Sequence, residues 1–157
     1  MMRTLVGISL LGFVAALSAA SGTPAADSAV ASSASGQGTM SFGADGHGAG
    51  VFQFNVARGG LPSGSLLFAG EEAHRFPDIV VRMDNIRNAR FGVRSVQFSG
   101  RGTLHDQPVT VSVTAFDGAG TKDPDSFGIK CKNAEGKIVL EARGELTSGD
   151  VVVGTPS

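Results

Sequence analysis

Apolar and polar residues alternate through most of this chain, and the alternation limits its fold more than any other feature. At 52–56, 79–83 and 109–115 every second residue is apolar. Successive side chains of a β-strand point to opposite faces of the sheet, so each segment predicts a strand with one buried face. Runs of the same character occupy 66–68, 96–104, 127–131, 138–146 and 151–153. About eight strands are therefore expected.

The links between these runs are short and rich in turn-forming residues. A parallel pair needs a connection of about a dozen residues or more, whereas only 105–108 separates the strand expected at 96–104 from the next one, at 109–116. Gly100 and Gly102 share one face of the first of these strands, which indicates close packing or sharp coiling of the sheet. We expect an all-β fold, either an antiparallel β-barrel or a closely related β-sandwich of about eight strands, mainly in meander order.

The parity of the apolar positions changes once in the middle of the chain. Phe91 and Val93 occupy odd positions, whereas Val96 and Phe98 occupy even ones. One continuous strand would not bury both pairs, because a shift of one residue exchanges the two faces. A bulge or a turn is therefore expected near Arg94.

Phenylalanine supplies all of the aromatic content, since the chain has 10 Phe and no Trp or Tyr. Full burial of one such side chain stabilises a fold by roughly 1.5 to 3 kcal/mol, so phenylalanines should dominate the core. The expected core set is Phe42, Phe52, Phe54, Phe68, Phe76, Phe98 and Phe127.

The first twenty residues predict export across a membrane. Arg3 gives a positive start, 4–17 is uncharged and largely apolar, and 18–20 consists of small residues. This is the pattern of a signal peptide, and its apolar run is shorter than the roughly 20 residues that span a bilayer. We expect 1–20 to be removed and the mature protein, without a membrane span, to be secreted, periplasmic or at the cell surface.

The segment that follows, 21–38, is expected to be a flexible leader. Thirteen of its 18 residues are Ala, Ser or Gly, and they show no apolar periodicity. Such a segment buries too little surface to offset its loss of backbone entropy. One folded β-domain is therefore expected over 39–153, followed by a short tail at 154–157.

Charge offers no sign of a highly charged partner. The chain has a net charge of −1, so it has no electrostatic reason to bind nucleic acid or an anionic membrane. One stretch is locally basic, and we interpret it as a solvated face because the spacing of its charges is mixed. It comprises Arg82, Arg87, Arg90, Arg94 and Arg101.

Five short motifs follow one another along the chain, at 52–56, 64–68, 98–102, 113–118 and 125–129. In this order they resemble a domain that is often found alone behind a signal peptide in exported bacterial proteins of unknown function, the post-COAP type. The resemblance covers most of the chain from Gly38 to Val153. That family often has Tyr followed by Asp where this chain has Phe68 and Ala69. The resemblance implies a compact exported β-domain without an assigned catalytic residue.

The best candidate for a binding site is the acidic loop 117–125. Asp117, Asp123 and Asp125 could give carboxylate oxygens to a hard cation such as Ca²⁺, which takes about six to eight oxygen ligands. Asp-Gly and Asp-Pro pairs also form turns, in which the carboxylate accepts hydrogen bonds from nearby backbone amides. We favour the turn interpretation because Lys122 places a positive charge inside the loop, and calcium is the alternative.

No set of catalytic residues stands out. His47, His74 and His105 each fall in an expected loop beside a carboxylate. The Gly-x-Ser-x-Gly motif of hydrolases and the spacings of zinc ligands are absent. Cys131 is the only cysteine, and we interpret it as a small buried residue on a strand.

These observations predict an exported, noncatalytic binding or structural module of the cell envelope or extracellular space, with a protein or cell-surface partner. Two alternatives stay open. A small barrel could hold an apolar ligand inside, which predicts a deep apolar pocket. A secreted hydrolase could use one of the loop histidines, which predicts that histidine in a cleft beside a serine or carboxylate.

Overall fold

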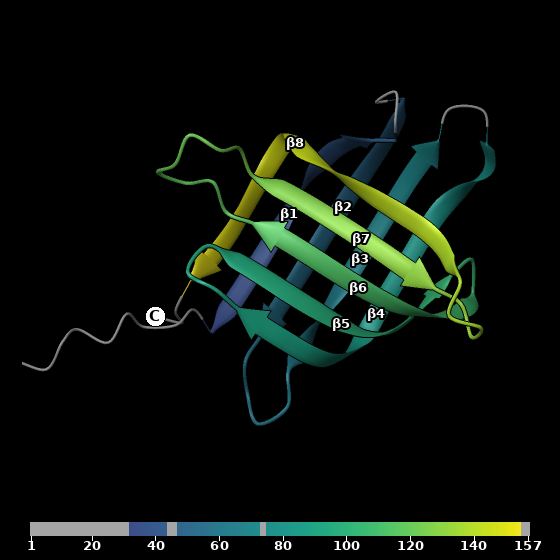
Figure 1. Cartoon of the computed structure of the whole chain (residues 1–157), viewed down its shortest axis with the longest axis horizontal. Helices are drawn as coiled ribbons and strands as arrows, with labels where there is room; N and C mark the ends of the chain where they lie inside the picture. Colours follow the sequence, from purple (N-terminus) through teal and green to yellow (C-terminus); the bar gives the residue numbers. More distant parts are fainter. Residues whose placement is uncertain (1–31, 44–46, 73–74, 155–157) are drawn as a thin grey trace, which may run out of the picture.

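The computed structural model describes residues 32–43, 47–72 and 75–154, and these form a closed antiparallel β-barrel (Figure 1). Each strand pairs with the next, and the last pairs with the first, so the order is a meander. The expected fold class is confirmed, and the chain forms the barrel rather than the sandwich. The strands are β1 (Ser33–Phe42), β2 (Gly48–Ala57), β3 (Ser63–Glu72), β4 (Arg75–Phe91), β5 (Ser95–Leu104), β6 (Gln107–Phe116), β7 (Ser126–Lys132) and β8 (Ile138–Gly154).

Within these described ranges, no helix has the length and apolarity that crossing a bilayer requires.

The domain boundary predicted at Thr39 is too late, because β1 begins at Ser33 and pairs with both β2 and β8. Packing explains why this strand is so rich in small residues. A Cβ on Gly36 would lie 2.5 Å from the ring of Phe54, and one on Gly38 would overlap the carbonyl oxygen of Ser148. The composition that suggested a flexible leader therefore belongs, in part, to a strand whose neighbours approach closely.

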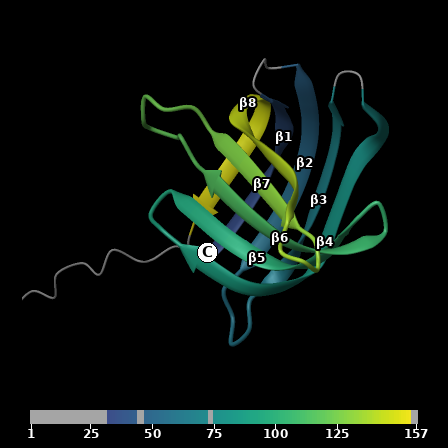
Figure 2. The same ribbon diagram turned by 45° about the vertical axis from the view of Figure 1, so that its right-hand side comes forward.

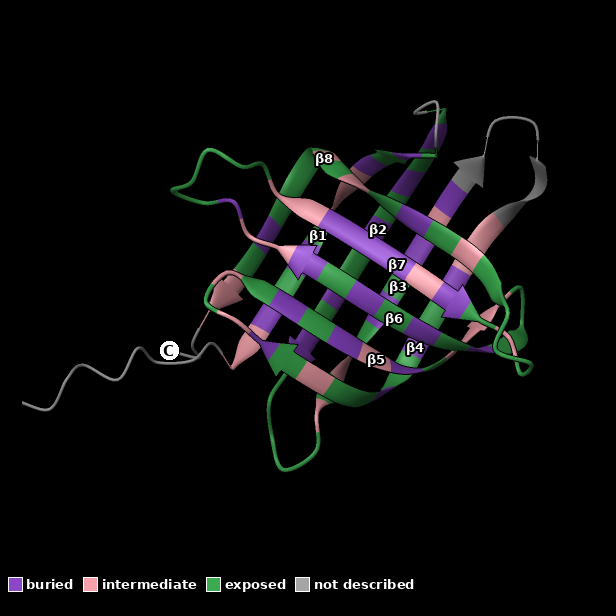
Figure 3. Ribbon diagram, viewed as in Figure 1, coloured by how far each residue is buried: buried purple, intermediate pink, exposed green. Residues whose placement is uncertain are grey.

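The barrel interior is filled by apolar side chains. Buried and exposed residues alternate along the strands (Figure 3), as expected when every second side chain points inward. The rings of Phe52 and Phe127 stack in the middle, with centroids 4.1 Å apart and planes inclined by 5°. Phe76 lies outside the part of the chain whose side chains are described. The other six predicted core phenylalanines are buried: Phe42, Phe52, Phe54, Phe68, Phe98 and Phe127.

The wall coils sharply where β4 meets β5. β4 carries two irregularities of register, at 83–85 and 86–88, each of which inserts an extra residue opposite β5. On β5, a Cβ on Gly100 would overlap the carbonyl oxygen of Asn85, and Gly102 is similarly crowded. Bulges bend a strand and increase its twist, so the close packing predicted from the two glycines is confirmed.

The parity change near Arg94 is a turn, because β4 ends at Phe91 and β5 begins at Ser95. The hairpin expected after it is also present. Only His105 and Asp106 link β5 to β6, with φ of 49° and 61°. Positive φ at both central residues is typical of a type I′ turn, whose twist matches that of the flanking strands.

β8 is one strand of 17 residues, although the sequence indicated two runs, 138–146 and 151–153. Its first part pairs with β7 as far as Glu145, and the rest pairs with β1. Figure 2 shows β1 and β8 side by side along this seam. The long strand therefore changes partners along its length, because β7 is only 7 residues long.

Both ends of the described chain lie at one end of the barrel, which we call the terminal end. There, the Ser32 N–H donates a hydrogen bond to the Gly154 carbonyl oxygen at 3.1 Å. The β2–β3, β4–β5 and β6–β7 links lie at the terminal end because the strands alternate in direction. The β5–β6 turn and the β7–β8 turn lie at the opposite end.

Candidate functional site

The acidic loop 117–125 links β6 to β7 at the terminal end, and two of its carboxylates reach β8. Oδ2 of Asp125 accepts a hydrogen bond from the Val151 N–H at 2.6 Å, and Oδ2 of Asp117 accepts one from the Val153 N–H at 3.2 Å. Pairing of β8 with β7 stops at Glu145, so these N–H groups have no strand partner on that side. The carboxylates replace the carbonyl groups that a longer β7 would supply.

The second oxygen of each carboxylate holds the backbone of the loop. Oδ1 of Asp125 accepts a hydrogen bond from the Gly118 N–H at 2.8 Å, and Oδ1 of Asp117 accepts one from the Ala119 N–H at 2.8 Å. Both carboxylates are half-buried. All four oxygens therefore accept main-chain hydrogen bonds, and the two bonds within the loop are of the kind that the turn interpretation expects.

Asp123 does not join the other two aspartates. Its side chain is exposed, and its backbone N–H donates a hydrogen bond to Oγ1 of Thr121 at 3.1 Å. In the part of the chain that the structure describes, no three His, Cys, Asp or Glu side chains gather as metal ligands would. The donor set does not fit a calcium ion, because the oxygens of Asp117 and Asp125 are directed at amide groups.

A further acidic residue, Asp150 on β8, lies beside this loop. Partial desolvation, a hydrogen bond with Asp125 and the negative charges of Asp125 and Asp117 raise the pKa of Asp150 above the usual aspartate value. A backbone hydrogen bond from Val151 opposes part of this shift. The fold thus holds like charges together at the seam of the barrel, which favours protonation of Asp150.

The described histidines do not form a catalytic set. His47 precedes β2 and His105 lies in the β5–β6 turn, and both side chains are exposed. Among the described side-chain hydrogen bonds, none joins either histidine to a serine or carboxylate. His74 lies outside the described residues. The hydrolase alternative therefore gains no support from the geometry of His47 and His105.

Cys131 on β7 is fully buried. Burial raises the pKa of its thiol to about 12, so the nucleophilic thiolate is scarce near neutral pH. Its neighbours Lys130 and Lys132 lie on the outer face, where Lys130 Nζ is 2.9 Å from Glu141 Oε1. The interpretation of Cys131 as a small buried residue is confirmed.

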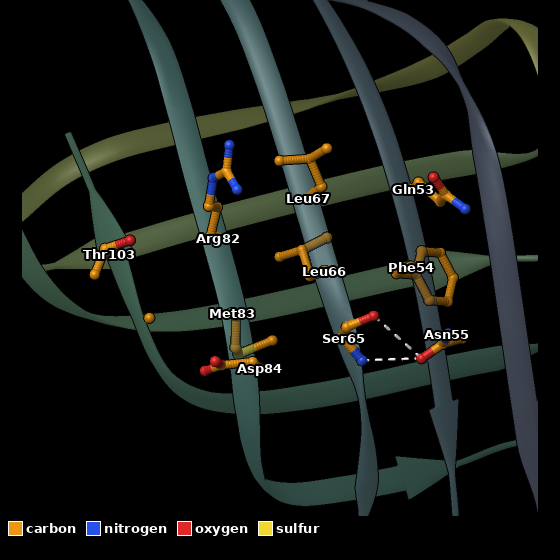
Figure 4. A pocket seen from close by; sticks show the side chains of 11 residues that line it. Gln53, Phe54, Asn55, Ser65, Leu66, Leu67, Arg82, Met83, Asp84 and Thr103 are labelled. Atoms are coloured by element: carbon orange, nitrogen blue, oxygen red, sulfur yellow. Dashed lines mark hydrogen bonds between the residues drawn. The ribbon is translucent and has the colours of Figure 1, made fainter. Parts of the chain in front are cut away.

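An open hollow of about 490 Å³ lies on the outer face of β2–β5 (Figure 4). Oδ1 of Asn55 accepts a hydrogen bond from the Ser65 N–H at 2.9 Å, which ties β2 to β3 at one side of the hollow. Arg82 and Thr103 approach from β4 and β5. The outward-pointing residues around it are Gln53, Asn55, Ser65, Leu67, Arg82, Asp84 and Thr103.

A second open hollow, of about 440 Å³, lies farther along the wall on the outer face of β4–β6. Arg87 and Arg101 are exposed between the two hollows. The outward-pointing residues of the second hollow are Asn88, Arg90, Gln97, Ser99, Ser112 and Thr114. Amide, hydroxyl and guanidinium groups thus surround both hollows, and the first also has the Leu67 side chain and the Asp84 carboxylate.

Four of the five arginines of the predicted basic stretch share this outer surface. We call Arg82, Arg87 and Arg90 on β4, with Arg101 on β5, the arginine face; all four side chains are exposed. Arg94 lies apart in the β4–β5 turn, where its carbonyl oxygen accepts a hydrogen bond from the Asp117 N–H at 2.8 Å.

Sequence reasoning placed these arginines on a solvated face but did not place Gln53 and Asn55 of β2 near them. The two groups share one surface only because β3 pairs with both β2 and β4.

Comparison of the chain with models of protein families, with curated proteins and with solved structures gives no match.

Proposed function

We propose that this chain is an exported, noncatalytic β-barrel module that binds a partner in the cell envelope or extracellular space through the outer face of β2–β6. The observation that carries the proposal is the pair of hollows on this face, lined by amide, hydroxyl and guanidinium groups. Such groups recognise a partner by hydrogen bonds and charge. Export rests on the signal-peptide pattern of residues 1–20.

The packed interior supports an outer site over an internal one. The ring of Phe52 stacks on that of Phe127 at 4.1 Å, and the rings of Phe54 and Phe98 have centroids 5.4 Å apart. An apolar ligand inside the barrel would have to displace these rings from a close-packed core. A partner at the outer face displaces only water.

Closure of the barrel favours recognition by side chains. A partner that adds a strand needs a free sheet edge, whereas every strand here pairs with a neighbour on each side over at least part of its length, β1 with β8 included. Where β8 extends beyond β7, Asp117 and Asp125 already accept the N–H groups of Val153 and Val151. Partner binding is therefore assigned to outward side chains.

The test is binding of the chain, expressed from its full-length sequence, to isolated envelopes of the source organism. We expect saturable binding that falls about tenfold in the double variant Gln53→Ala/Arg82→Ala, because each exposed contact contributes roughly 0.5 to 1 kcal/mol. The control is Lys137→Ala/Arg143→Ala, which removes two exposed cationic side chains from the β7–β8 link and from β8, outside the proposed face.

Three outcomes would contradict the proposal. Absence of saturable binding would exclude an envelope partner. An equal loss in the two double variants would exclude the outer face of β2–β6 as the binding site. Release of soluble fragments from the envelopes by the purified chain would show catalysis.

A further inference from the structure

We propose that the arginine face binds a carboxylated polysaccharide. This inference rests on the proposed function and names the chemistry of the partner. It combines the distribution of charge on the barrel wall with the neutral hydrogen-bonding groups of the two hollows.

Charge is distributed unevenly around the wall. The strands β1, β2 and β6 contain no charged residue. From Ile79 onward, β4 and β5 carry the four residues of the arginine face against one acidic residue, Asp84. This part of the wall is therefore positive although the chain as a whole has a net charge of −1. A local excess of one charge attracts ligands of the opposite charge.

Among the side chains that the structure describes, no carboxylate forms an ion pair with a guanidinium of the arginine face. Among the described residues, the recorded ion pair joins Lys130 to Glu141, on β7 and β8. From Ile79 onward, β4 and β5 carry arginines and no lysine. A guanidinium binds a carboxylate through two parallel hydrogen bonds, a geometry that the ammonium group of lysine does not offer.

The arginine face is extended, which suits a polymer better than a small anion. From Arg82 to Arg90 the strand covers roughly 25 Å. The irregularity at 86–88 adds Arg87 as an exposed residue between them, and Arg101 faces outward from β5 opposite Asn85. Charges repeated along the wall match carboxylates repeated along a chain of sugars.

The neutral residues of the hollows distinguish a sugar polymer from a nucleic acid. Gln53 and Thr103 at one end, and Asn88 and Gln97 at the other, both donate and accept hydrogen bonds, as sugar hydroxyls do. Among the described side chains of β2–β6, the outward face carries one aromatic ring, that of Phe116, half-buried at the end of β6, so it offers no row of rings on which successive bases could stack. Paired carboxylates would compensate for the missing aromatic platform that neutral sugars require.

The experiment measures binding of the chain, expressed from its full-length sequence, to immobilised polygalacturonate, with dextran as the neutral polymer and polyphosphate as the phosphate polymer. We expect binding to polygalacturonate that weakens with salt, with no binding to dextran and weaker binding to polyphosphate. The variant Arg87→Gln/Arg90→Gln/Arg101→Gln should bind polygalacturonate about 100-fold more weakly, at roughly fivefold for each guanidinium.

The control Lys122→Gln/Lys137→Gln/Arg143→Gln removes the same charge elsewhere and should change affinity by less than about threefold if the contact is local. Equal weakening in both triple variants would overturn the arginine face as the site. Tighter binding to polyphosphate would overturn the carboxylate assignment. Failure to bind polygalacturonate while envelope binding persists would overturn this inference and leave the proposed function standing.

Discussion

The backbone N–H of Val151 donates a hydrogen bond of 2.6 Å to Oδ2 of Asp125, 26 residues earlier in the chain. This contact joins the β6–β7 loop to the long strand β8 at the place where β7 has ended. A loop carboxylate thereby completes the hydrogen bonding of a wall that would otherwise expose main-chain donors. The acidic loop thus has a structural task at the seam of the barrel.

Substitution Asp125→Ala should lower the free energy of unfolding by about 3 kcal/mol, because it leaves the N–H groups of Val151 and Gly118 without their charged acceptor. Urea unfolding measures the change. The matched control is Asp123→Ala, which removes an exposed carboxylate from the same loop and should cost less than about 0.5 kcal/mol. Equal losses would show that the hydrogen bonds to β8 contribute nothing.

Substitution Asp150→Asn should raise the thermal midpoint at pH 7. The pKa of Asp150 is raised from about 3.8 in the folded chain, so folding favours the protonated carboxyl. Its contribution to stability is complete at pH values below about 3.8 and is lost as the pH rises through the folded pKa. The gain from asparagine should therefore vanish near pH 3. A gain of the same size at pH 3 and pH 7, or the same pH dependence in Glu135→Gln, would contradict this origin.

Substitution Phe54→Ala should destabilise the barrel by about 3 to 5 kcal/mol, because the ring is buried and a cavity would remain in its place. Chemical denaturation of the two proteins gives the difference. Val93→Ala removes apolar atoms from a side chain that is 80% exposed and should change stability by less than about 0.5 kcal/mol. A small effect of Phe54→Ala would exclude the close-packed interior.

Stability should fall above pH 9 because of Cys131. Burial raises its pKa from about 9 to about 12, so the folded state holds the thiol proton more tightly than the unfolded state does. This contribution is complete below about pH 9 and is lost as the pH rises toward about 12. The difference in unfolding free energy between the native chain and Cys131→Ala should shrink over this range.

The burial of Cys131 can also be tested by labelling. A thiol reagent should modify Cys131 only after unfolding, and rapid labelling at pH 7 would contradict its burial.

Removal of divalent cations should leave the thermal midpoint unchanged. A cation bound only to the native state would raise stability in proportion to the logarithm of its concentration over its dissociation constant. Because the oxygens of Asp117 and Asp125 already accept main-chain hydrogen bonds, we expect no shift with a chelator or with added calcium. A midpoint that falls with the chelator and recovers with calcium would restore the calcium alternative.

Sequence analysis identified correctly those strands in which the alternation of neighbouring residues shows which face is buried. The alternation at 52–56 predicted the two faces of β2, and the parity change near Arg94 predicted the turn before β5. In contrast, β1 was missed at 33–38 because its glycines are explained only by the ring of Phe54 and the backbone at Ser148, which approach from other strands. The composition of 33–38 does not show which residues of other strands will pack against it.

The same limit applies to the candidate site. Turn formation could be predicted from the pairs Asp117-Gly118 and Asp123-Pro124, because contacts such as that of Asp117 with the Ala119 N–H lie within the loop. Their contacts with Val153 and Val151 depend on how far β7 extends, which a single strand pattern does not determine. The hollows likewise depend on the register of several strands, and so does the exposure of Arg87, which follows from the irregularity at 86–88 rather than from alternation.

The hydrogen bond between Ser32 and Gly154 shows that the two ends of the described chain lie next to each other. The chain therefore comes close to closing on itself, as its sheet does. A short linker between these two residues should allow new termini to be opened in the β7–β8 turn without rethreading a strand. A domain fused before Ser32 and one fused after Gly154 would both be joined to the barrel at its terminal end. In a tandem array, successive barrels would therefore be joined through their terminal ends.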